Sequence, residues 1–435
     1  MTEPKVGWVS PVGVTRQDPA QAVVGLRCAN PTYPSHWTTP KLKYVATLKS
    51  GEAITSDDIS DTGDYPVFGG NGFRGYTSAF THSGTYVLIG RQGALCGNIN
   101  YVSGDFWASE HAVVVDIKDG HKVRWLCELL GSMNLNQYSQ AAAQPGIAVD
   151  VIGNLSIPVP PIAEQAIIAD YLDCETARID SLIAGKERML ALLEEKRIAF
   201  ISCVVTRGLD PGAPMKPSGQ EWLAEIPAHW KLQRLKHLAD VRGGLTLGKQ
   251  YGGSVLDAYP YLRVANVQDG YLMLNDVLTV EVPASEVESN LLAYGDVLMN
   301  EGGDIDKLGR GCIWRDEISP CLHQNHVFAV RPHAVGSDWL ALWTSTLEAK
   351  RYFETRAKRS TNLASISGSN VKELPVPLPP IAEQEAILQF VQETTRRIER
   401  LKAELRASLL LLGERRAALI TAAVTGQVPL EAMQP

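Results

Sequence analysis

The chain has 435 residues and a formal net charge of −7 at pH 7, with a composition that is ordinary for a globular protein. This length predicts two or three domains, each large enough for a core of its own. The negative charge gives no general sign of a nucleic-acid partner. No run of 18 apolar residues occurs, which argues against a membrane span.

The seven cysteines are odd in number and form no Cys-x-x-Cys pair. We therefore expect a reduced, cytoplasmic protein without a zinc site. The opening Met-Thr-Glu-Pro-Lys lacks the apolar core of a signal peptide. Residues 1–33 are rich in Pro, Gly and Val without a clear period, and we expect an irregular N-terminal arm there.

Residues 34–155 are expected to form a first domain of the α+β class. It opens with the sequence Pro34-Ser35-His36-Trp37. The apolar runs Tyr86–Ile89 and Ala112–Val115 are bounded by Gly and Asp, which is typical of strands. A helical pattern follows at Val123–Leu135.

Residues 156–208 predict a long helix of about 40 residues, roughly 60 Å at 1.5 Å per residue. Pro160 and Pro161 precede it, and prolines are tolerated at a first helical turn. Apolar residues with polar interruptions then recur in steps of four and three, which is the pattern of a coiled-coil seam. The predicted seam positions are 168, 172, 175, 179, 182, 186, 189, 193, 196 and 200.

Residues 209–228 contain four prolines and are expected to be a linker. A second α+β domain is expected at 229–374, because Pro227-Ala228-His229-Trp230 repeats the earlier opening at an offset of 193 residues. Asp296–Met299 and His326–Val330 are strand-like runs, and Trp339–Thr355 has a helical pattern.

Residues 375–435 repeat the first helix. The motif Pro-Pro-Ile-Ala-Glu-Gln at 160–165 returns at 379–384, an offset of 219 that holds without a gap until Thr206 matches Thr425. The chain is therefore a duplicated half-protein, too long in its period for a solenoid. Because both helices carry the same seam, we expect them to bury it against each other. The alternative is two unrelated surface helices that dock on separate cores.

Four short motifs invite an enzymatic interpretation. Phe68–Gly72 matches the Phe-x-Gly-x-Gly loop that binds S-adenosylmethionine, but no helix is predicted after it and no catalytic Asn-Pro-Pro-Tyr follows. Gly243–Lys249 matches most of a P-loop, but Gln250 stands where magnesium needs Ser or Thr. A glycine-rich turn explains each match better than a cofactor.

The other two motifs are equally weak. Glu194-Glu195-Lys196 resembles half of a nuclease motif, but it lies within the predicted helix, where solvated charge is the simpler interpretation. His323 and His326 are three residues apart in a non-helical context, which does not favour a metal site.

Two segments nevertheless have the residue types of a DNA-binding surface. No Asp or Glu occurs from Tyr65 to Gly104, and Lys350–Arg359 holds five cations opposed only by Glu354. Arg, Asn and Gln are suited to base edges, and Lys and Ser to phosphates. The alternative is a merely solvated face, and charge alone does not decide between the two.

The sequence resembles the specificity subunit of Type I restriction–modification systems. The resemblance depends on the repeated PPIAEQ motif, on TRGLDPGAPMKPSGQEWLAEIPAHW, and on YPVFGGNGFRGY and YLRVANVQDGYL. It covers the chain after about residue 34 and gives no account of the N-terminal arm. It implies two target recognition domains, 34–155 and 229–374, and two conserved helical regions, 156–208 and 375–435, whose helices pair as an antiparallel coiled coil.

The resemblance also implies a function. Each recognition domain would bind one half of a split site in double-stranded DNA, and this chain would have no catalytic site. The partners implied are two modification (methyltransferase) subunits and the restriction (motor-nuclease) subunits, which would hold S-adenosylmethionine, ATP and magnesium. A stand-alone methyltransferase or nuclease is the alternative. The candidate DNA-binding residues are Asn71, Arg74, Tyr76, Arg91, Gln92, Lys249, Arg263, Asn266, Lys358, Arg359, Ser360 and Asn362.

Overall fold

The computed structural model describes residues 33–93, 95–118, 120–139, 146–248, 251, 255–303, 308–359 and 364–434. They divide into two compact units: the residues up to Lys186 with those from Arg406 on, and Glu187–Leu405. No helix in these ranges is long and apolar enough to cross a membrane. Nearly all of the expected N-terminal arm, and the candidates Lys249, Ser360 and Asn362, lie outside the described residues.

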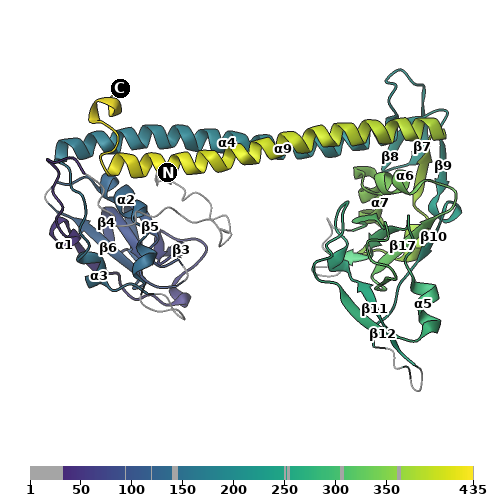
Figure 1. Cartoon of the computed structure of the whole chain (residues 1–435), viewed down its shortest axis with the longest axis horizontal. Helices are drawn as coiled ribbons and strands as arrows, with labels where there is room; N and C mark the ends of the chain where they lie inside the picture. The colour runs from purple at the N-terminus through teal and green to yellow at the C-terminus, as the bar shows by residue number, and fades with distance from the viewer. Residues whose placement is uncertain are drawn as a thin grey trace. The chain divides into compact units, whose positions relative to one another are not determined.

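The first unit is built on a six-stranded sheet with the order β1-β6-β4-β5-β2-β3 (Figure 1). Neighbouring strands are antiparallel except β2 and β5. The strands are β1 (Ala46–Ser50), β2 (Tyr65–Gly69), β3 (Gly72–Thr77), β4 (His82–Gly90), β5 (Ile99–Ala108) and β6 (Ala112–Ile117). The short helices are α1 (Leu42–Val45), η1 (Ser56–Asp58), α2 (Val123–Ser132), η2 (Leu135–Tyr138), α3 (Val149–Gly153) and η6 (Leu430–Met433).

Strand β4 is buried on both faces, and its sequence shows why. Val87 and Ile89 share a core cluster with Trp125 of α2. Leu88 packs with Phe106 in a separate cluster on the other face. A strand covered on both faces needs an unbroken apolar run instead of alternation. The strands and the helix expected in this domain are all confirmed, although the helix is shorter than expected and a 3-10 turn follows it.

The second unit has a four-stranded antiparallel sheet with the order β10-β17-β13-β15, and smaller sheets β12-β11-β16, β14-β19-β18, β20-β9 and β7-β8. The strands are β7 (Met215–Gln220), β8 (Leu223–Pro227), β9 (Lys231–Arg234), β10 (Ala239–Arg242), β11 (Asp257–Leu262), β12 (Leu278–Val282), β13 (Val297–Asn300), β14 (Gly302–Gly303), β15 (Gly311–Ile313), β16 (Leu322–His323), β17 (Val327–Pro332), β18 (Lys358–Arg359), β19 (Ala364–Ser365) and β20 (Pro375–Leu378). The short helices are η3 (Leu235–His237), η4 (Val264–Asn266), α5 (Ala284–Asn290), α6 (Ser337–Thr344), α7 (Leu347–Arg356) and α8 (Gly368–Lys372).

Two expectations for this unit need correction. The helical stretch Trp339–Thr355 is two helices, α6 and α7, because the Thr346 hydroxyl accepts a hydrogen bond from the Ala349 amide (3.2 Å) and begins a new helix. The expected linker 209–228 contains the β7–β8 hairpin, whose Leu223 and Ile226 are buried in the core. The two predicted strands are confirmed as β13 and β17.

The central sheets of the two units are equivalent. Strands β10-β17-β13-β15 follow the same order as β1-β6-β4-β5, and all of their pairings are antiparallel. In each central sheet the first strand along the chain, β1 or β10, lies at the edge. The interiors of the two domains diverge in sequence and length, yet they share this core, which their sequences alone did not predict.

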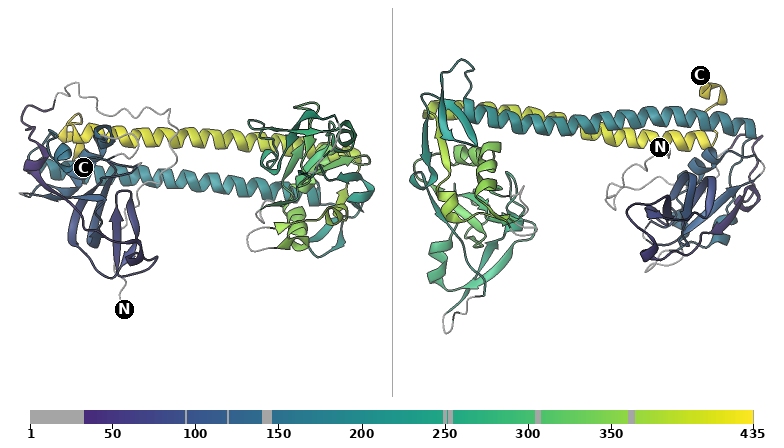
Figure 2. Two further views of the ribbon diagram at one scale, coloured as in Figure 1. Left: turned by 90° about the horizontal axis from the view of Figure 1, so that it is seen from below. Right: turned by 180° about the vertical axis from the view of Figure 1, so that it is seen from behind.

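The long helices are α4 (Ile162–Arg207) and α9 (Ile381–Val424), and they lie side by side in both views of Figure 2. In the first unit Ile168 of α4 packs with Ile420 of α9, near the start of one helix and the end of the other. In the second unit the order is reversed, since Ile201 packs with Val391. The helices are thus antiparallel in each unit, which confirms the expected coiled coil.

The register of the seam is mostly right. The predicted positions that are buried or partly buried are 168, 172, 175, 179, 186, 193 and 200. Lys196 is exposed, and so are Leu182 and Met189. Their successors Ile183 and Leu190 are less exposed, so the seam steps from 179 to 183, 186 and 190. The apolar pattern could not distinguish the two phases, because both neighbours are apolar at these turns.

A repeated junction attaches each domain to a helix start. Glu164 accepts hydrogen bonds from Trp37 Nε1 (2.9 Å) and pairs with His36 (2.9 Å). Its repeat, Glu383, pairs in the same way with the equivalent Trp230 (3.1 Å) and His229 (2.8 Å). The Pro-x-His-Trp and Pro-Pro-Ile-Ala-Glu-Gln motifs therefore form one structural device, used twice.

Candidate nucleic-acid interface

The central sheets of both domains end in the same backbone arrangement. Beyond β4 and β6, the Arg91 amide donates to the His111 carbonyl (2.8 Å). Beyond β13 and β17, the Glu301 amide donates to the His326 carbonyl (2.9 Å). These two places are structurally equivalent and are called here the first and second polar edges.

A later segment returns to each edge in the same way. The Ile147 amide donates to the Arg91 carbonyl (3.0 Å), and the Ile366 amide donates to the Glu301 carbonyl (2.9 Å). Ile147 and Ile366 are 219 residues apart, the offset of the helix repeat. The segments before them, which include Ser139 in one domain and Lys358 in the other, therefore approach equivalent places.

At the first polar edge, the β2–β3 hairpin packs tightly on the end of β4. A Cβ on Gly90 would lie 2.1 Å from the Gly70 carbonyl oxygen, and a Cβ on Gly70 would lie 3.0 Å from the Gln92 and His111 carbonyl oxygens. Only glycines allow this approach. The glycine-rich match to a cofactor loop is thus a hairpin, with strands before and after it, and it brings Asn71 to this edge.

The side chains of the first polar edge include two arginines and an ion pair between His111 and Glu110 (3.3 Å), together with uncharged polar groups. Gln92 Oε1 lies 3.0 Å from His111 Nδ1, and Arg91 donates to the Ser50 hydroxyl (3.0 Å). Asn71 and Arg74 are exposed and form no hydrogen bond or ion pair with any described residue. The edge therefore offers donors and acceptors to an external ligand.

At the second polar edge, Glu301 and His326 form an ion pair of 2.6 Å. Lys358 and Arg359 are exposed on β18, which pairs with β19 and, through it, with β14 directly after Glu301. A groove of about 630 Å³ results. It is lined by Val264, Glu301, Gly302, Gly303, Gln324, His326, Lys358, Arg359, Ala364 and Ser365.

The structure assigns the remaining described candidates to structural positions. Asn266 is buried, and its amide nitrogen donates to the Met273 and Asp276 carbonyls (2.9 Å each), so it is not available to a base. Arg263 is held by Asp276 at 2.9 Å. Tyr76 is half-buried, with its ring against Phe73. We leave Asn266 out of the interface for this reason.

Sequence reasoning missed His111 and the Glu301–His326 pair. A signal was present, since His111 directly precedes the predicted strand Ala112–Val115 and His326 is the first residue of the predicted strand His326–Val330. The spacing of His326 to His323 draws attention to a metal site instead. His323 is buried, and its Nδ1 lies 2.7 Å from the Val327 carbonyl oxygen. No group of three metal-binding side chains occurs among the described residues.

Two similar domains with polar ends, each attached by an equivalent junction to the start of a long helix, define a protein built from an internal duplication. Comparison with protein families identifies the class. Residues 34–188 and 227–410 match the family described as Type I restriction modification DNA specificity domain. These ranges cover well over half of the chain, which therefore belongs to this family.

Individual relatives agree. The chain is 45% identical over 130 residues to the Type I restriction enzyme EcoprrI specificity subunit of Escherichia coli, covering 29% of this chain and 32% of that protein. It is 26% identical over 245 residues to the EcoKI specificity subunit of Escherichia coli strain K12, covering 55% and 50%. The matches thus span about a third to a half of these relatives' length.

Solved structures show the same fold. A chain from a study of complex assembly and conformational transition of the type I R-M system superposes with a TM-score of 0.67 at 17% identity, over 92% of this chain and 100% of that chain. The HsdS subunit from Thermoanaerobacter tengcongensis gives a TM-score of 0.51 at 15% identity, over 92% and 99%.

Proposed function

We propose that this protein is the DNA-specificity subunit of a Type I restriction–modification complex and that each domain binds one half of a bipartite site in double-stranded DNA. The observation that carries this proposal is the structural equivalence of the two polar edges. Each edge is formed by the ends of two equivalent strands, β4 and β6 in the first domain and β13 and β17 in the second. Both edges combine a histidine with exposed hydrogen-bond donors. Duplicated edges with different side chains suit two half-sites of different sequence.

The side chains at each edge suggest a division of roles. Asn71, Arg74 and Gln92 have the groups that bind adenine and guanine edges in the major groove. Lys358 and Arg359, exposed beside a groove, suit phosphates, which position a protein without reading sequence. In the pair Glu301–His326, the carboxylate of Glu301 would add an acceptor for the cytosine amino group.

The paired helices would set the spacer and dock the partner subunits. In the first unit Leu182 and Leu411 are at least half-exposed, and in the second unit their repeats, Leu401 and Leu192, are exposed to a similar extent. Leucines exposed at repeated positions in the two units fit two copies of one partner, namely the modification subunits.

Catalysis would then belong to the partners. S-adenosylmethionine would bind the modification subunits, and ATP with magnesium the restriction subunits, while this chain contributes sequence recognition only. We place the assembly in the cytoplasm, together with its DNA substrate. The N-terminal arm has no role in this proposal.

The test compares the full chain alone with the chain plus its modification subunits. The chain alone should methylate nothing, and the complex should methylate adenine only at a bipartite site. Leu411→Glu and Leu192→Glu should each reduce the partner stoichiometry in native mass spectrometry from two to one, with exposed Tyr44→Glu as the control. Methylation by the chain alone would favour a stand-alone enzyme and overturn the proposal.

The spacer role has a separate test. Deleting seven residues from each helix, 183–189 and the matching 402–408, keeps the heptad phase. The complex should then recognise the same half-sites at a different spacing. Changed half-sites at an unchanged spacing would contradict the role of the helices.

A further inference from the structure

In the second unit, strand β10 is the edge of the central sheet and pairs only with β17 among the described strands. Leu238 and His333 are bonded just before the strand, where the His333 amide donates to the Leu238 carbonyl (2.9 Å). In an antiparallel ladder, every second residue pair exchanges main-chain hydrogen bonds. Leu238 and His333 are one such pair, so the next is Asp240 with Arg331, which face each other in the register of the two strands. Ala239 and Val241 therefore direct their amides and carbonyls away from the sheet.

A groove of about 510 Å³ runs along this outer edge. It is lined by Lys236, Ala239, Asp240, Val241, Arg242, Arg331 and Lys372. Ala239 is buried, whereas Val241 is partly exposed, and its main-chain groups have no hydrogen-bond partner in the described part of the chain. An unpaired strand edge of this kind is a template for another strand.

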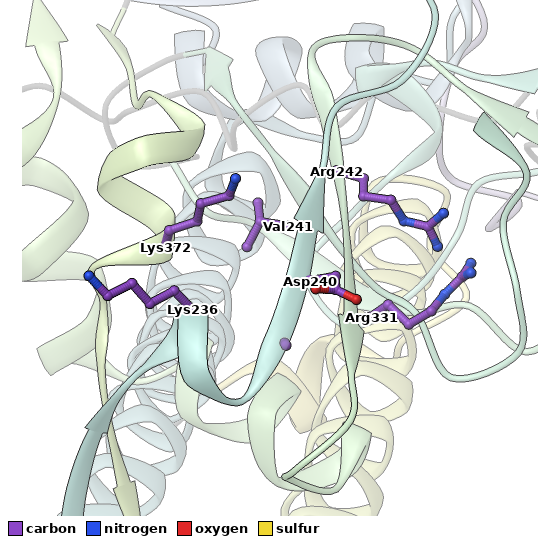
Figure 3. A pocket seen from close by; sticks show the side chains of 7 residues that line it. Lys236, Asp240, Val241, Arg242, Arg331 and Lys372 are labelled. Atoms are coloured by element: carbon purple, nitrogen blue, oxygen red, sulfur yellow. The ribbon is translucent and has the colours of Figure 1, made fainter. Parts of the chain in front are cut away.

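The cations of the groove lie on both faces of the strand. Figure 3 shows Lys372 beside Val241 on one side of β10 and Arg242 beside Asp240 on the other. Lys372 is exposed and Arg242 is half-buried, and neither forms an ion pair with a described residue. The buried Nε of Arg242 lacks a hydrogen-bond partner.

The other two cations are used within the fold. Lys236 pairs with Glu373 at 2.6 Å, and Arg331 pairs with the buried Asp296 at 2.7 Å. The groove therefore has two uncommitted positive charges, Lys372 and Arg242, on opposite faces of one edge strand.

This arrangement selects an extended ligand over a compact one. A phosphate would require the two cations to converge on one point, whereas they lie on opposite faces. Adjacent side chains of an added strand point to opposite faces, so two adjacent carboxylates would meet Lys372 and Arg242 separately. We propose that the outer edge of β10 binds an acidic, extended segment of a partner polypeptide by strand addition, a recognition mode in which main-chain hydrogen bonds provide affinity.

The first unit contains a matched comparison. Its edge strand β1 pairs with β6 in the register that β10 has with β17. The pair Thr47↔Asp116 corresponds to Asp240↔Arg331, so an aspartate replaces the arginine on the neighbouring strand. Gly153 occupies the place of Lys372 at the offset of 219. Lys49 is the only cation at a place equivalent to the uncommitted pair, so the acidic segment should select the second unit.

The experiment uses the full chain and a fluorescein-labelled, end-blocked peptide, Thr-Val-Glu-Glu-Val-Thr, in fluorescence anisotropy at low salt. Lys372→Met and Arg242→Met should each weaken binding roughly fivefold, the effect of losing about 1 kcal/mol from an exposed ion pair. Lys49→Met in the first unit should have no effect. The peptide with Gln-Gln in place of Glu-Glu should bind more weakly than either variant binds the original.

Val241→Pro tests the main-chain part. The Val241 side chain packs against the core, so Val241→Ala is the control for lost packing and should keep peptide binding. The Val241 amide points away from β17, so proline removes no ladder bond, and Val241→Pro should lose peptide binding while circular dichroism shows a folded chain. Binding of the peptide by Val241→Pro as tight as by the parent chain, or no binding of the peptide to the parent chain, would overturn the proposal.

The proposal would also be overturned if Lys372→Met and Arg242→Met left peptide binding intact and instead lowered the salt slope of DNA binding, since the edge would then contact phosphates. Half-site recognition is measured separately and does not affect these outcomes.

Discussion

The two polar edges have the same backbone and place their charges on different elements, although in both the histidine pairs with a glutamate: His111 with Glu110 (3.3 Å) and His326 with Glu301 (2.6 Å). In the first domain the strand end supplies a cation, Arg91, and the returning segment supplies the neutral Ser139. In the second domain the strand end supplies the anion Glu301, and the returning segment supplies Lys358 at the place equivalent to Ser139. The histidine is common to both.

This difference shows how one frame can serve two DNA sequences. The backbone bonds at Arg91 and Glu301 position the edge and do not depend on the side chain. The side chains can therefore change without loss of the fold. The junctions and helices, in contrast, repeat their side chains closely, because there the side chains themselves hold the structure.

Removing the tryptophan of either repeated junction should have the largest effect on stability. Trp230 is fully buried and Trp37 nearly so, and each donates a hydrogen bond to the glutamate of its junction. Trp230→Ala and Trp37→Ala should each lower the free energy of unfolding by about 3–5 kcal/mol. Urea titration followed by circular dichroism measures the loss, with exposed Tyr44→Ala as a control. A loss in only one domain would show that the junctions are not equivalent.

The next effect sharpens the contrast between the edges. Lys358→Ala with Arg359→Ala should weaken matched and mismatched DNA about equally and reduce the salt slope by about 0.9 per phosphate contact. Asn362→Ala should cost about 1–3 kcal/mol on the cognate base only. Anisotropy titrations of the complex at several salt concentrations measure both. Relaxed specificity at an unchanged slope in the double variant would reverse the assigned roles.

A smaller effect distinguishes the two halves of the helix pair. In the second unit, Glu194 is bonded by Arg197 and by Lys402 (2.8 Å), and these contacts lower the pKa of Glu194 to about 2. In the first unit Asp180 of α4 pairs with Arg416 of α9 (2.8 Å).

Because the folded pKa of Glu194 is below its ordinary value of 4.5, its contribution is present above pH 4.5 and is lost as the pH falls toward 2. Glu194→Gln should therefore flatten the decline in the thermal midpoint of the full chain between pH 4.5 and 2. Asp180→Asn is the matched change in the other unit and should alter this window less. Identical profiles for the two variants would argue against the difference.

The smallest expected effect concerns the cofactor. Gly70→Ala with Gly72→Ala should leave S-adenosylmethionine binding by the complex unchanged, because the loop is a hairpin without a following helix. The same variant should disturb recognition by the first domain, since Gly72 has a φ of +91° and a Cβ on Gly70 would crowd two carbonyls. Crosslinking of labelled cofactor to this chain would contradict the assignment to the partner.

Much of the frame was predictable from the sequence because duplication is visible without a structure. The offset of 219 predicted paired helices, and the apolar runs predicted the central strands. The phase of the seam was not predictable, since Leu182 and Ile183 are both apolar and only burial in the structure distinguishes them. The candidate site was predicted less well, because composition shows that a segment is polar and not where its side chains point.

Asn266 and His111 illustrate this limit. Neither lies in the two segments that composition singles out. Asn266 folds inward to bond the backbone, whereas His111 is placed at the edge by a long-range bond to Arg91. Such pairings depend on the sheet register. The equivalence of His111 with His326 became evident only once both registers were known.

The central claim is that each domain recognises one half of the site independently. The direct measurement replaces residues 37–155 with the corresponding segment of a family member of different specificity and determines the methylated sequence by methylome sequencing of a host carrying the full system. The account predicts that one half-site changes while the other half-site and the spacer stay the same. A chimera that folds and assembles but changes or loses both half-sites would contradict it.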